Sequence, residues 1–157
     1  MTKFKIVLVA PEIPGNTGSI GRTCVALDLE LILIKPLAFD IDEKAVRRAG
    51  LDYWKHVKIK TYDNFQDFLD NEKPNVDNMF FFSKHGSKNL FEAEFKEDCY
   101  LIFGSETKGL AAEILKDYSS SLVSLPMYSE HIRSLNLANA ATAVAYEALR
   151  QISFIKN

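Results

Sequence analysis

Short, nearly continuous apolar runs dominate the pattern of this sequence. The four clearest are Ile6-Val7-Leu8-Val9, Leu31-Ile32-Leu33-Ile34, Met79-Phe80-Phe81-Phe82 and Tyr100-Leu101-Ile102-Phe103. Such runs are typical of strands whose two faces are both covered, as in parallel sheets. Apolar runs alternate with segments typical of helices. The predicted strands are 5–10, 31–35, 57–61, 79–83, 100–104 and 122–126, and the predicted helices are 17–28, 42–50, 63–71, 110–117 and 136–153.

This alternation predicts an α/β fold with a mostly parallel sheet flanked by helices. Asp63 is the predicted N-cap of the third helix. The length of 157 residues, 47% of them hydrophobic, suits one compact domain over 1–157. The last predicted helix is rich in alanine, which indicates either a buried helix built from a good helix former or close packing in a crowded core or a subunit interface.

The charge balance excludes a polybasic binder of nucleic acids. Lysine plus arginine is 19 and aspartate plus glutamate is 21, so the formal net charge is −2. Between 44 and 60, however, the sequence has six lysine and arginine residues and one acidic residue, Asp52. The aromatic residues Tyr53 and Trp54 lie among them. This local pattern is typical of a nucleic-acid contact, with a solvated basic surface as the alternative.

Cysteine and histidine usage indicates a reducing compartment without a metal site. Cys24 and Cys99 are far apart and have no CxxC partner, which favours a cytoplasmic protein with free thiols. The histidines are widely separated, so no metal ligand set is expected. No window approaches the roughly 20 apolar residues that a membrane-spanning helix needs, and the N-terminal run is typical of a strand rather than a signal peptide. No membrane partner is expected.

Three polar segments follow predicted strands. The first, 11–22, has glycines spaced G-x-x-G-x-x-G and carries Arg22 one helical turn later, where it can reach a phosphate. This spacing is not that of a dinucleotide-binding loop. The second, 103–110, lacks the Walker pattern, and the third, 125–140, offers Ser134 and Asn136 as helix N-caps. Each is explicable as a plain turn or cap, yet together they meet at the strand ends where α/β sheets bind ligands.

The same segments resemble a known family. Its motifs match Pro11-Glu12-Ile13-Pro14-Gly15-Asn16-Thr17-Gly18 with Arg22, then 47–53, then Phe103-Gly104-Ser105-Glu106-Thr107-Lys108-Gly109-Leu110, and finally Leu125-Pro126-Met127 with Arg133-Ser134-Leu135-Asn136-Leu137. In this order they resemble the SPOUT class of SpoU-like RNA 2′-O-methyltransferases. The similarity is to the small branch that methylates the wobble nucleotide of tRNA, cytidine or uridine 34.

The resemblance implies a C-terminal trefoil knot, a homodimer and transfer of a methyl group from S-adenosylmethionine, which leaves S-adenosylhomocysteine. It implies binding to the tRNA anticodon stem-loop. By motif, the implied catalytic residues are Arg22, Glu106 and Asn136, and the implied cofactor contacts are Phe82, Gly104, Leu125 and Ser134. The implied substrate contacts are Asn16, Arg47, Arg48, Lys55, Arg133 and Tyr146, and Lys58 is a further candidate for a phosphate contact.

The residues leave two roles open for Glu106, since it can accept the proton of the 2′-hydroxyl or order its loop. Arg22 is expected to hold the target phosphate, because a guanidinium is effectively never neutral. Three alternative functions are weighed against the wobble methyltransferase. They are a methyltransferase of the same fold acting on rRNA or another tRNA position, a nonenzymatic RNA-binding dimer, and a nicotinamide-dependent enzyme. The glycine spacing disfavours the last.

Overall fold

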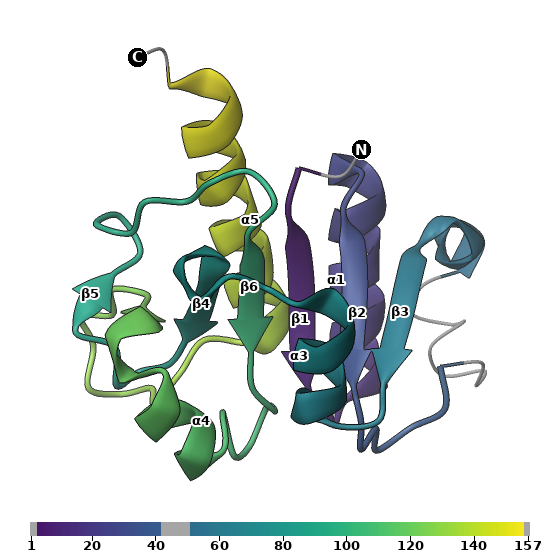
Figure 1. Cartoon of the computed structure of the whole chain (residues 1–157), viewed down its shortest axis with the longest axis horizontal. Helices are drawn as coiled ribbons and strands as arrows, with labels where there is room; N and C mark the ends of the chain where they lie inside the picture. The colour runs from purple at the N-terminus through teal and green to yellow at the C-terminus, as the bar shows by residue number, and fades with distance from the viewer. Residues whose placement is uncertain (1–2, 42–50, 156–157) are drawn as a thin grey trace.

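A seven-stranded parallel sheet forms the centre of the molecule (Figure 1). The computed structural model describes residues 3–41 and 51–155. The strand order is β3-β2-β1-β6-β4-β7-β5, and every pairing between neighbouring strands is parallel. The strands are β1 Lys5–Val9, β2 Glu30–Ile34, β3 Lys58–Tyr62, β4 Met79–Phe82, β5 Lys88–Asn89, β6 Tyr100–Phe103 and β7 Leu122–Ser124.

Helices cover both faces of the sheet. The α-helices are α1 Pro14–Leu27, α3 Phe65–Glu72, α4 Ala112–Asp117 and α5 Leu137–Phe154. Short 3-10 helices span Leu51–His56, Val76–Asn78 and Ser119–Ser121. Helices α1 and α5 lie on one face, and α3 and α4 lie on the other (Figure 1). Side chains of each strand therefore alternate between two apolar cores, one with Ile20 of α1 and Ala141 of α5, the other with Phe68 of α3 and Ile114 of α4.

The predicted strands are confirmed, because burial on both faces makes each central strand apolar throughout. Strand β5 was not predicted, since its two residues, Lys88 and Asn89, are both polar. The predicted helix at 42–50 lies outside the described residues. The prediction that Asp63 caps α3 is wrong: Asn64 is the N-cap, and its side chain accepts a hydrogen bond of 2.8 Å from the amide of Asp67. Asp63 instead precedes the cap, and its amide donates to the Asp67 carboxylate.

Small residues on α5 allow close packing in the core. Ala141, Ala145 and Ala148 are fully buried. Where α5 meets α1, the hydroxyls of Thr23 and Thr142 lie 2.8 Å apart. The opposite side of α5 is open, since Tyr146 is 53% exposed. The alanine-rich sequence of this helix thus serves a crowded core on at least one face.

The two cysteines are free and buried in the same core. Burial raises the pKa of the Cys24 thiol to about 12, and burial is also the largest cause that raises the pKa of Cys99 to about 12. Thiols with such a pKa are unreactive at neutral pH. None of the helices in 3–41 and 51–155 is long and apolar enough to cross a membrane.

A carboxylate at the end of α3 holds this helix against the sheet. The Glu72 side chain, only 8% exposed, accepts hydrogen bonds from the hydroxyls of Tyr62 and Tyr100, the latter at 3.1 Å. Lys60 Nζ lies 3.4 Å from the same carboxylate and 3.3 Å from Glu30. Burial raises the pKa of Glu72, but the Tyr62 hydrogen bond and the charge of Lys60 outweigh it, so the pKa lies below its usual 4.5.

This depressed pKa predicts an acid-sensitive contribution to stability. A carboxyl group with a lower pKa in the folded state stabilises the fold above its unfolded pKa and loses that contribution as the pH falls through the folded pKa. We expect Glu72→Gln to lower the free energy of unfolding at neutral pH and to flatten its decline between about pH 5 and pH 3. Urea titrations at several pH values measure both effects. Glu113→Gln, on the exposed side of α4, is the control, and an equally steep decline in Glu72→Gln and wild type would contradict the assignment.

Candidate functional site

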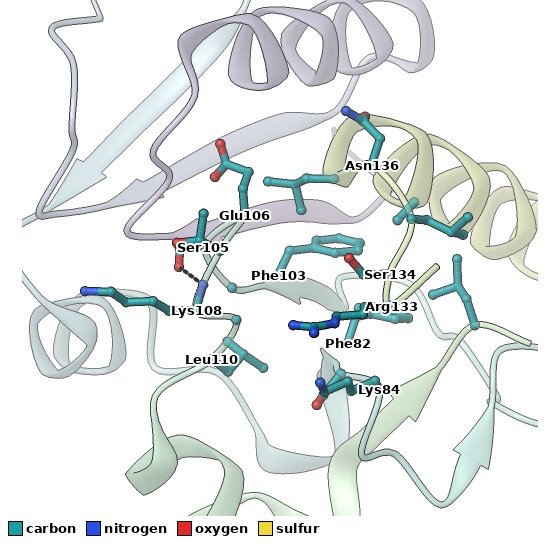
Figure 2. A pocket seen from close by; sticks show the side chains of 18 of the residues that line it. Phe82, Lys84, Phe103, Ser105, Glu106, Lys108, Leu110, Arg133, Ser134 and Asn136 are labelled. Carbon is teal, nitrogen blue, oxygen red and sulfur yellow. Dashed lines mark hydrogen bonds between the residues drawn. The ribbon is translucent and has the colours of Figure 1, made fainter. Parts of the chain in front are cut away.

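A cavity of about 540 Å³ opens at the carboxyl ends of β4, β6 and β7, beside the start of α5 (Figure 2). Its position follows from the parallel sheet, because the loops after parallel strands all emerge at one edge. Its apolar lining consists of Phe82, Phe103, Leu110, Leu125, Leu137 and Ala140, among others. The rings of Phe82 and Phe103 stack with centroids 4.7 Å apart. Polar groups from three loops complete the wall.

Glu106 links the loop after β6 to the loop after β1. Its carboxylate accepts hydrogen bonds from the backbone amides of Glu12, at 2.9 Å, and Ile13. The side-chain amide of Asn16 also donates to it, at 3.4 Å. Both oxygens of the Glu106 carboxylate are therefore engaged by the start of α1.

Glu12 makes the reciprocal contact. Its carboxylate accepts hydrogen bonds from the hydroxyl and the amide of Thr107, at 2.7 and 3.3 Å. Hydrogen bonds from the Thr107 and Ser105 side chains are the largest causes that hold the pKa of Glu12 below its usual value, and the charge of Lys108 adds to them. Each of the two loops thus supplies a carboxylate to the backbone of the other, which fixes their relative position.

Asn136 joins the third loop to this pair. Its side-chain amide donates a hydrogen bond of 3.1 Å to Asn16 Oδ1, while its own Oδ1 accepts from the amide of Asn139 and so caps α5. Of the two predicted caps, Ser134 and Asn136, Asn136 is the one that caps the helix. A chain of contacts from Glu106 through Asn16 to Asn136 therefore connects residues that are 90 and 120 positions apart.

Two glycines shape the loop after β6. Ser105 and Gly109 exchange backbone hydrogen bonds of 2.9 and 3.2 Å, which fold the loop back on itself. A Cβ atom on Gly104 would lie 2.2 to 2.5 Å from the backbone of Gly109 and Leu110. Gly109 has φ of +66°, a conformation that side chains disfavour. These glycines allow the tight turn that places Glu106 and Lys108 at the cavity.

Most of the residues predicted for the site meet at this cavity. Eight of them line it: Asn16, Phe82, Gly104, Glu106, Leu125, Arg133, Ser134 and Asn136. Figure 2 shows Arg133 pointing into the cavity from the segment before α5. Lys84 and His85 also line the cavity, although they were not predicted from the sequence. Their place directly after the predicted strand at 79–83 was the available signal.

Three of the other predicted residues do not line the cavity, and two cannot be placed. Arg47 and Arg48 lie outside the described residues. Arg22, Lys55 and Tyr146 are exposed elsewhere on the surface and are not part of the lining. The guanidinium of Arg22 lies 5.4 Å from the ring centroid of Tyr53, on the outer side of α1.

Several side chains of the segment at 51–60 make contacts within the fold. The Tyr53 hydroxyl donates a hydrogen bond of 3.1 Å to the carbonyl of Gly18, and the Trp54 ring packs against Gly21. Lys58 pairs with Asp28 at 2.6 Å. Much of the aromatic and basic character that suggested a nucleic-acid contact therefore serves to dock this segment on α1 and β2, and exposed Lys55 stays a candidate.

A sequence model of the SpoU rRNA methylase family matches residues 3–146. The chain belongs to this family. The resemblance drawn from the motifs is therefore confirmed. Among SpoU relatives, the tRNA (cytidine(34)-2′-O)-methyltransferase of Burkholderia cenocepacia is 41% identical over 152 residues, covering 96% of this chain and 97% of that protein.

Solved structures agree with the SpoU assignment. One, described as giving structural insights into the 2-OH methylation of C/U34 on tRNA, superposes with a TM-score of 0.88 at 43% identity, covering 94% of this chain and 95% of the other. Another is the SpoU methyltransferase AviRb of Streptomyces viridochromogenes in complex with AdoMet, with a TM-score of 0.79 at 32% identity. That match covers 96% of this chain and 61% of AviRb.

No group of three or more metal-ligating side chains lies together in 3–41 and 51–155.

The crowding at Gly104 predicts a specific sensitivity to substitution. We expect Gly104→Ala to lower the free energy of unfolding by about 1–3 kcal/mol, because the new methyl group collides with backbone atoms of its own loop. Gly15→Ala is the matched control: nothing lies within 4 Å of a Cβ there, and alanine favours the helix by up to about 1 kcal/mol. Urea unfolding measures both, and equal stability of Gly104→Ala and wild type would contradict the described turn.

Proposed function

We propose that this protein transfers a methyl group from S-adenosylmethionine to the ribose 2′-hydroxyl of tRNA nucleotide 34, whether cytidine or uridine. The proposal rests on the cavity, where Asn16, Glu106 and Asn136 join three loops. It is supported by the similarity of almost the whole chain to the tRNA (cytidine(34)-2′-O)-methyltransferase named above. The family as a whole is named for rRNA, so the identity of the RNA is the part that needs direct measurement.

The cavity suits this cofactor. Its volume of about 540 Å³ falls in the range of nucleoside-sized sites, and an apolar wall formed by Phe82, Phe103 and Leu125 suits an adenine ring. Ser134 and the backbone at Gly104 supply polar groups beside this wall. When bound, the cofactor supplies an electrophilic methyl group on a positively charged sulfur. We assign Phe82, Gly104, Leu125 and Ser134 to hold it.

Positioning is the main task that remains for the protein, because the methyl group is already reactive. We assign Glu106 the role of ordering the loops rather than accepting the proton, since both of its oxygens already accept hydrogen bonds from the start of α1. Asn16 and Asn136 extend that order to α5. These groups position the 2′-hydroxyl, and its proton passes to water.

Arg22 fits this scheme in a dimer. It is exposed on α1, outside the cavity of its own chain. We propose a homodimer in which Arg22 reaches the cavity of the second copy, where its guanidinium holds the target phosphate and polarises the hydroxyl. Exposed Tyr146 on the adjacent helix α5 would lie toward the same interface.

We also propose that the C-terminal segment is threaded as a trefoil knot. In support, the Gln151 side chain near the end of α5 donates to the carbonyl of Ala93 and accepts from the amide of Phe95, at 3.0 and 2.9 Å. Helix α5 thus lies against the connection between β4 and β6, the loop through which such a segment would pass.

The proposed reaction predicts label at a single nucleotide. Incubation of unmodified tRNA with methyl-labelled S-adenosylmethionine, followed by nuclease digestion and mass mapping, should place a 2′-O-methyl group at nucleotide 34. Label at another tRNA position, or in an rRNA fragment tested in parallel, would keep the chemistry and overturn the substrate. Absence of both label and calorimetric binding of the cofactor would overturn the methyltransferase.

The placement of Arg22 predicts complementation between inactive variants. Arg22→Ala removes the guanidinium, and Ser134→Trp blocks the cavity. Each variant alone should be inactive, with cofactor affinity of Arg22→Ala within a few-fold of wild type. In an equimolar mixture that exchanges subunits, heterodimers keep one intact site, so activity should return to about a quarter of wild type. No recovery, despite exchange shown by mass spectrometry, would place Arg22 at the cavity of its own chain.

A further inference from the structure

Three exposed basic side chains surround the cavity. Lys84 comes from the loop after β4, Lys108 from the loop after β6, and Arg133 from the segment before α5. We call these three residues the basic rim. Figure 2 shows the Arg133 guanidinium pointing into the cavity, with Lys84 on the wall below it and Lys108 on the opposite wall, its side chain extending away from Arg133.

The basic rim is unpaired, unlike Lys58 and Lys60 on β3. Lys58 and Lys60 each lie within 3.4 Å of a carboxylate. In the part of the chain that the structure describes, no side chain of the rim forms a hydrogen bond or an ion pair. The charge of Lys108 contributes to lowering the pKa of Glu12, but as the last of its causes.

The carboxylates near the cavity do not neutralise the rim. Glu106, the acidic residue in the lining, accepts hydrogen bonds from the amides of Glu12 and Ile13. Glu12 is likewise held by Thr107. Both carboxylates form hydrogen bonds with the loops rather than with the cations but keep their negative charges, so the three cations exceed these two carboxylates by one positive charge.

The proposed cofactor does not account for this excess. S-adenosylmethionine carries one net positive charge, because its carboxylate balances only one of its ammonium and sulfonium groups. A cluster of cations would repel it unless a polyanion were also present. Phosphodiester groups supply that negative charge, and lysine and arginine are the side chains that bind them.

We infer that Lys84 and Lys108, together with Arg133, bind the phosphodiester groups that flank the ribose to be methylated. This inference rests on the proposed function and specifies how the RNA enters the same cavity. The three side chains stand on three different loops, so they contact the RNA backbone from more than one side and fix the ribose between them. Such contacts position the nucleotide without reading its base, which suits an enzyme that accepts cytidine or uridine.

The experiment compares Lys84→Ala/Lys108→Ala with wild type and with Lys96→Ala, an exposed lysine before β6 at the opposite edge of the sheet. Binding of an anticodon stem-loop RNA is measured over a range of salt concentrations, and cofactor binding is measured by calorimetry. We expect the double variant to bind the RNA about tenfold more weakly, with its logarithmic salt slope reduced by about 2, and to bind the cofactor within about twofold of wild type. Lys96→Ala should match wild type, and Lys84→Arg/Lys108→Arg should restore the slope.

Methyl transfer distinguishes the two proposals. A higher KM for RNA with kcat within a few-fold of wild type supports the phosphate contacts. If wild type methylates nucleotide 34 but the double variant keeps the wild-type salt slope, the inference about the rim is wrong and the proposed function stands. If the double variant loses cofactor affinity instead, the lysines bind the cofactor carboxylate and the inference is also wrong. If wild type does not methylate nucleotide 34, the proposed substrate fails, while the salt slope still tests the rim.

Discussion

The site depends on the contact between the Glu106 carboxylate and the first amides of the loop that leads into α1. Without it, the hydrogen bonds between Thr107 and Glu12 would be left to join the loops after β1 and β6. An ionised acceptor facing backbone N–H groups makes a stronger hydrogen bond than a neutral one, and here the contact is doubled by Glu12 in the reverse direction. Asn16 and Asn136 then attach α5 to the same assembly. The shape of the cavity and the structure of its loops are therefore set by the same few side chains.

The sheet was predictable because its central strands are buried on both faces, so that each appears in the sequence as an uninterrupted apolar run. The position of the site was predictable for a related reason, since parallel strands deliver all of their following loops to one edge. The family motifs then indicated which residues in these loops belong to the site. Eight of those predicted, from Asn16 to Asn136, do line one cavity.

What could not be predicted depends on contacts between distant segments. Asp63 and Asn64 are both acceptable caps, and only the backbone path into α3 decides for Asn64. Nothing in the local pattern of 51–60 shows that Tyr53 and Trp54 pack on α1 or that Lys58 pairs with Asp28. Lys84 carries no motif of its own and gains meaning only from the loops beside it. Arg22 was expected near a phosphate, and its distance from the cavity becomes visible only when α1 is placed.

Strand β6 lies between β1 and β4, although it follows both of them in the chain. Until residues 100–103 arrive, β1 and β4 each present an unpaired edge and cannot reach each other. During synthesis, β1 and β4 therefore keep these edges unpaired until β6 has been made. The sheet can close only late, and a folding nucleus that spans such distant segments forms slowly. A domain of this topology has reason to fold chiefly after its last helix has left the ribosome.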